Sequence, residues 1–127
     1  MSKPRILIID DDRTILEMLQ IALVRADFET LLATDGDIGL RLFRDEQPDL
    51  VIIDVAMPGM DGYDVVERIR KGEPPDQPTP IIMLTAHNQS VMRNYASELG
   101  ADLYLAKPIA PKELVDHIHR LLGILPG

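Results

Sequence analysis

The chain has 127 residues, of which 46% are hydrophobic and 27% are charged. This length and composition predict one domain with a single sizeable core. The 13 basic and 21 acidic residues leave a formal net charge of −8, which gives the domain no electrostatic reason to bind nucleic acid. Because the chain contains no cysteine, disulfides, zinc thiolate sites and thiol nucleophiles are excluded.

The first apolar segment, Ile6–Ile9, contains only four residues before Asp10. A secretory signal needs a longer apolar stretch, and a transmembrane helix needs about 20 such residues. We therefore expect a soluble cytoplasmic domain that makes no membrane contact.

Short apolar segments alternate with longer amphipathic segments along the chain. Several short segments are apolar at every position, which is typical of parallel strands buried on both faces. Strands are expected near residues 5–10, 28–33, 49–54, 80–85 and 102–106. Helices are expected near residues 13–26, 36–46, 62–71, 88–99 and 111–122. Five such β-α units predict an α/β fold, a doubly wound parallel sheet with helices on both faces.

Residues at the expected helix ends agree with these bounds. Thr14 and Glu17 have the spacing of a capping box, although Asp12 could cap the same helix instead. Gly100 suits a helix C-terminus, and Pro111 suits a first helical position.

Polar side chains follow four of the five expected strands. They are Asp10-Asp11-Asp12, Asp54, Thr85 and Lys107. Ligands of open parallel sheets bind beyond the carboxyl ends of the strands, so we expect these side chains to converge there. Crowded carboxylates repel one another unless a cation lies among them, and an all-oxygen cluster suits Mg²⁺ or Mn²⁺. A lysine beside such a cation suits an added anion such as a phosphoryl group.

Each of these residues has a simpler explanation when it is taken alone. Asp12 and Thr85 are typical helix caps, and a lysine is most often solvated. Their expected meeting at one edge of the sheet is what favours a functional site.

In this order and spacing, the segments resemble the receiver domain of two-component response regulators. The resemblance covers essentially the whole chain. It rests on Ile6–Asp12, on Asp54 with Met57–Gly62, on Thr85-Ala86 and on Lys107-Pro108. It implies a flavodoxin-like (βα)5 fold with the strand order 2-1-3-4-5. It also implies a cis peptide bond between Lys107 and Pro108.

The resemblance further implies that Asp54 accepts a phosphoryl group from a histidine of a sensor kinase or phosphotransfer protein. Asp54, Asp11 and the backbone carbonyl of Ala56 would bind Mg²⁺ directly, and Asp10 would act mainly through water. Such a domain catalyses its own phosphorylation and dephosphorylation and is a signalling domain, not an enzyme acting on a substrate.

The remaining residues implied by the resemblance bind the phosphoryl group and transmit its presence. Lys107 would pair with the phosphoryl oxygens, and Thr85 would donate its hydroxyl to them. Tyr104 would turn inward as Thr85 moves. The surface of the fourth helix, fifth strand and fifth helix would then change and control an output domain or a downstream protein.

The resemblance is also compatible with a phosphorylation-linked dimer. In the winged-helix transcription-factor branch, an acidic residue at the position of Leu103 and an arginine at that of His117 help to form the salt bridges of the dimer. Both are replaced in this chain, so a dimer of that geometry would lack these ionic contacts.

An enzyme is the alternative hypothesis. Asp10–Thr14 after an apolar segment also resembles the Asp-x-Asp-x-Thr motif of haloacid-dehalogenase-type phosphatases. Asp10 would then be the nucleophile and Asp12 the acid/base. That assignment leaves Asp54 and the segment Met57–Gly62 without a role.

Overall fold

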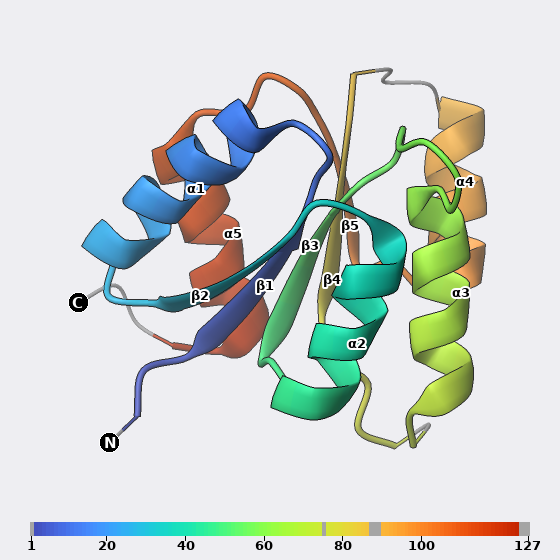
Figure 1. Ribbon diagram of the computed structural model, residues 1–127, viewed down its shortest axis with the longest axis horizontal. Coiled ribbons are helices and arrows are strands. Elements are labelled where there is room, and N and C mark those ends of the chain that lie inside the picture. Colours follow the sequence, from blue (N-terminus) through green and yellow to red (C-terminus); the bar gives the residue numbers. More distant parts are fainter. Residues whose placement is uncertain (1, 75, 87–89, 125–127) are drawn as a thin grey trace.

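The computed structural model describes residues 2–74, 76–86 and 90–124, in which five strands and five helices alternate (Figure 1). The strands are β1 (Arg5–Ile9), β2 (Glu29–Ala33), β3 (Leu50–Asp54), β4 (Ile81–Thr85) and β5 (Leu103–Ala106). The helices are α1 (Arg13–Arg25), α2 (Gly36–Glu46), α3 (Gly62–Gly72), α4 (Ser90–Leu99) and α5 (Pro111–Leu122). The expected start of the fourth helix, at residue 88, lies outside the described residues. Within the described part of the chain, no helix combines the length and apolar character needed to cross a bilayer.

All strand pairs are parallel, and the strands lie in the order β2-β1-β3-β4-β5. This order confirms the expected doubly wound α/β fold. The register aligns the carboxyl ends of β1, β3, β4 and β5, because Ile9 pairs with Ile53, Asp54 with Leu84 and Thr85 with Ala106. Residues that directly follow these strands therefore meet at one edge of the sheet.

Helices cover both faces of the sheet, with α1 and α5 on one face and α2, α3 and α4 on the other (Figure 1). Alternate residues of β1 enter the two resulting cores. Ile6 and Ile8 pack with α1 and α5, whereas Leu7 and Ile9 pack with α2 and α3. Burial on both faces is the reason why the strands are apolar at every position.

The structure shows which residues mark the ends of several helices. Asp12, and not Thr14, is the N-cap of α1, since its carboxylate accepts hydrogen bonds from the backbone N–H groups of Thr14 and Ile15. Pro111 is the first residue of α5, and Gly100 follows α4 with φ +108°. That left-handed conformation favours glycine.

Candidate functional site

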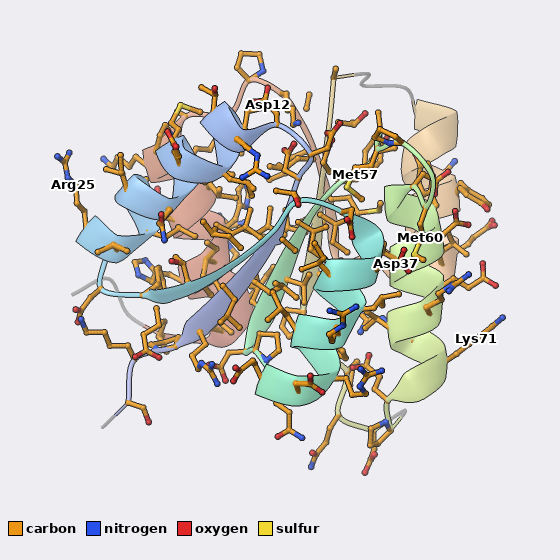
Figure 2. The ribbon with its side chains drawn as sticks, viewed as in Figure 1. Asp12, Arg25, Asp37, Met57, Met60 and Lys71 are labelled. Carbon is orange, nitrogen blue, oxygen red and sulfur yellow. The ribbon has the colours of Figure 1, made fainter. Side chains whose placement is uncertain are left out.

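Four strands bring the predicted polar residues to the same end of the sheet. Asp10 directly follows β1, Asp54 is the last residue of β3, Thr85 is the last residue of β4, and Lys107 directly follows β5. The labelled side chain of Asp12, at the start of α1, marks this end of the molecule in Figure 2. The structure thus brings together residues that lie up to 97 positions apart in the sequence.

Three carboxylates form the acidic part of the site. Asp10, Asp11 and Asp54 each offer one oxygen, and the three oxygens lie within 4.8 Å of one another. Asp10 and Asp54 are only 2% and 5% exposed, whereas Asp11 is exposed. Ala56 is exposed and lies in the loop that begins directly after β3. This all-oxygen donor set fits a hard divalent cation such as Mg²⁺.

Lys107 supplies the positive charge of the site. Its Nζ donates hydrogen bonds to Asp10 Oδ2 at 3.1 Å and to Asp54 Oδ1 at 3.0 Å. Its backbone N–H donates to the carbonyl of Thr85 at 2.6 Å. The peptide bond between Lys107 and Pro108 is cis, as the resemblance implied. One cation therefore bridges two buried carboxylates.

Burial and charge shift the pKa values of both partners in the central ion pair. Burial raises the pKa of Asp54, the charges of Asp10 and Asp11 raise it further, and Lys107 opposes the shift without cancelling it. Burial by itself lowers the pKa of Lys107, but its hydrogen bonds and charge interactions with Asp54 and Asp10 outweigh burial and raise it. Lys107 therefore stays charged, and Asp54 ionises less readily than an exposed aspartate does.

Asp54→Asn should increase the stability of the metal-free protein at neutral pH. Folding raises the pKa of Asp54, so above that raised pKa the ionised carboxylate lowers the free energy of unfolding. Below the usual pKa of an aspartate, the carboxyl is protonated in both the folded and the unfolded state, and the loss disappears. We expect a gain at pH 7 that fades as the pH falls from the raised pKa of Asp54 to the usual pKa of an aspartate. Urea unfolding at several pH values checks it.

The exposed residue Asp45, paired with its neighbour Arg44, provides the control for this prediction. Asp45→Asn should leave stability nearly unchanged, because exposed ion pairs contribute little. If Asp54→Asn proved less stable than the wild type at neutral pH, the Lys107 ion pair would outweigh the burial of the Asp54 charge.

The segment after β3 is packed tightly against the backbone of Asp54. The Gly62 N–H donates to the carbonyl of Val55 at 2.9 Å, and a Cβ atom at Gly62 would lie 2.5 Å from the carbonyl oxygen of Asp54. Met57 is buried and Met60 is half-buried, and both pack in the core on the α2-α3-α4 face. Only glycine fits at the first position of α3, so this segment holds the start of α3 against the end of β3.

Asp12 and Tyr104, two other residues of the sequence hypotheses, are not part of the carboxylate cluster. Asp12 is exposed and serves as the cap of α1. Tyr104 of β5 lies on the α2-α3-α4 face, where its hydroxyl is 3.2 Å from that of Tyr63. Burial, followed by the hydrogen bond to Tyr104, raises the pKa of Tyr63, so its hydroxyl stays protonated. Tyr63 was not predicted; its place directly after Gly62 in the first turn of α3 was the available signal.

Known proteins resemble this chain in sequence and in fold. Residues 6–119 match the family described as "Response regulator receiver domain". The relative named "Probable transcriptional regulator ycf27" from Guillardia theta is 43% identical over 121 residues, which are 95% of this chain and 46% of the relative. The DNA-binding response regulator MtrA of Mycolicibacterium paratuberculosis is 42% identical over 120 residues, 94% of this chain and 52% of MtrA. The chain thus spans about half the length of these curated relatives.

A solved structure agrees with the sequence relatives. The CheY-like response regulator receiver domain protein from Methanospirillum hungatei superposes with a TM-score of 0.89 at 30% identity, covering 96% of this chain and 95% of that chain. The family match spans most of the chain, and the strand order is that of the implied fold. The chain therefore belongs to the response regulator receiver domains, the phosphoacceptor domains of two-component signalling.

Proposed function

We propose that Asp54 is the phosphoacceptor of this domain and takes its phosphoryl group from a histidine of a sensor kinase or phosphotransfer protein. The observation that carries the proposal is the ion pair of Lys107 with Asp54, next to the carboxylates of Asp10 and Asp11. Phosphoryl transfer depends mainly on positioning and charge neutralisation, and this arrangement supplies both.

In the proposed step, a carboxylate oxygen of Asp54 attacks phosphorus in line with the bond to the donor imidazole nitrogen. That P–N bond breaks, its electron pair stays on the nitrogen, and an acyl phosphate forms on Asp54. Lys107 Nζ and the hydroxyl of Thr85 bind the phosphoryl oxygens. Asp54, Asp11 and the Ala56 carbonyl would hold Mg²⁺ or Mn²⁺, with Asp10 acting through water; the bound cation supplies further charge neutralisation.

The phosphoryl group adds a charge of about −1.5 to −2. We propose that Thr85 and Tyr104 change position in response to this charge. The responding surface would consist of α4, β5 and α5. Leu103 on this surface is half-buried, and its side chain packs against the core next to α5. Only part of it is therefore available to an output domain, a downstream protein or a second copy of the chain.

The structure supports the acceptor assignment over the phosphatase hypothesis. The phosphatase hypothesis needs Asp12 as an acid/base close to Asp10, but the Asp12 carboxylate accepts the N–H groups of Thr14 and Ile15 at the start of α1. The same hypothesis leaves the Lys107–Asp54 pair without a function.

The direct test is incubation of the protein with acetyl phosphate, with and without Mg²⁺, followed by intact mass and peptide mapping. We expect one phosphoryl group per chain, on the peptide that contains Asp54, and only when the metal is present. Sustained release of phosphate from a phosphomonoester without a labelled Asp54 would instead support the phosphatase.

A further inference from the structure

All tyrosines of the chain meet in one cluster between α3, α4 and β5. The sequence contains three tyrosines and no tryptophan. The hydroxyl of Tyr63 on α3 lies 3.2 Å from that of Tyr104 on β5. The ring of Tyr63 also meets the ring of Tyr95 on α4 edge-on, with centroids 5.0 Å apart and an interplanar angle of 67°. Tyr63 is therefore the member that contacts both of the others.

The backbone next to Tyr63 packs against the end of β3, which carries Asp54. Its neighbour Gly62 donates to the carbonyl of Val55 and packs against the carbonyl of Asp54 so closely that a Cβ atom would not fit. Asp61 caps α3 with a capping box, which fixes the first turn that carries Tyr63. The position of the Tyr63 side chain is thus set by the same backbone that positions Asp54.

The contact between the hydroxyl groups of Tyr63 and Tyr104 shows in which direction the Tyr104 side chain points. β5 is an edge strand of the sheet, and Tyr104 pairs in register with Met83 of β4, which is buried in the core on the α2-α3-α4 face. Tyr104 is half-buried and packs against that same core. Because its hydroxyl reaches α3, the side chain points from the edge of the sheet toward the interior.

We propose that Tyr63 is a positioning residue that holds Tyr104 in this inward position and links it to α4 through Tyr95. The inference rests on the proposed function, in which the inward position of Tyr104 accompanies phosphorylation of Asp54. If Tyr104 turns outward, the hydroxyl bond to Tyr63 is lost. Tyr63 therefore favours the conformation of Tyr104 that accompanies phosphorylation of Asp54. Because the ring of Tyr63 contacts Tyr95, a movement of Tyr104 also affects α4.

The test uses Tyr63→Phe, which removes the hydroxyl and keeps the ring. Protein containing isotope-labelled tyrosine is titrated with beryllofluoride, a phosphoryl mimic, in the presence of Mg²⁺ and followed by NMR. Since a net hydrogen bond corresponds to about a two- to tenfold change in an equilibrium, Tyr63→Phe should bind beryllofluoride about two- to tenfold more weakly. The Tyr104 signal of the unligated variant should also move away from its position in the wild type.

Tyr95→Phe is the matched control, because the hydroxyl of Tyr95 makes no hydrogen bond among the described residues and the ring contact is kept. It should bind beryllofluoride as the wild type does. If Tyr63→Phe matches this control in affinity, or if its affinity falls while the Tyr104 signal stays in place, Tyr63 does not position Tyr104. If the wild-type protein itself fails to respond to beryllofluoride, the proposed function falls, and the role of Tyr63 falls with it.

Discussion

Asp54→Asn will take up no phosphoryl group from acetyl phosphate in the presence of Mg²⁺, whereas the wild-type chain takes up one. The neutral amide has the shape of the carboxylate but lacks the anionic oxygen that attacks phosphorus. The other carboxylates of the cluster are less suited to replace it. Asp10 uses Oδ1 to accept the N–H of Asp12 and Oδ2 to accept Lys107, and Asp11 is exposed. Intact mass after incubation measures the result.

We expect Asp54→Asn to stay folded, so that unfolding does not explain the missing phosphoryl group. The substitution removes the buried charge of a carboxyl group whose pKa is raised by folding. Asp45→Asn, which removes an exposed carboxylate of α2, should be labelled like the wild type. Labelling of Asp54→Asn at the wild-type rate would show that the acceptor is another residue.

The strands and the edge that they share could be predicted from the sequence because each signal is local. An uninterrupted apolar segment predicts a strand buried on both faces, and the polar residue that ends the segment marks its carboxyl end. Asp54 after Leu50–Ile53 and Thr85 after Ile81–Leu84 are such cases. Parallel pairing then brings these residues together. The strand order, in contrast, was implied by the family resemblance and not by the residue pattern.

Other parts of the site depend on contacts that no local pattern encodes. Both Asp12 and Thr14 had the sequence of a cap, and only the hydrogen bonds of the folded chain distinguish them. The contact between Tyr63 and Tyr104 joins residues 41 positions apart, and its existence depends on how α3 packs on the sheet. The inward turn of Tyr104 on phosphorylation stays a prediction; the structure shows its hydroxyl beside that of Tyr63 on the α2-α3-α4 face.

Asp11→Ala should weaken Mg²⁺ binding on the order of tenfold or more, because a carboxylate ligand carries much of the affinity of a hard cation. Lys107 already engages Asp10 and Asp54. The carboxylate of Asp11, in contrast, forms no ion pair among the described residues, so it can bind a cation without breaking one. Titration with Mg²⁺, followed by calorimetry or amide NMR, measures the loss.

The neighbouring residue provides a control that separates coordination from overall charge. Asp12→Asn removes the same charge one position away and keeps the cap of α1, because asparagine caps helices about as well as aspartate. If Asp11 is a ligand, Asp12→Asn retains nearly the Mg²⁺ affinity of the wild type while Asp11→Ala loses it. If both variants lost Mg²⁺ affinity equally, the total negative charge at this edge of the sheet, and not direct coordination by Asp11, would attract the metal. Unchanged affinity in Asp11→Ala would exclude Asp11 from the metal site.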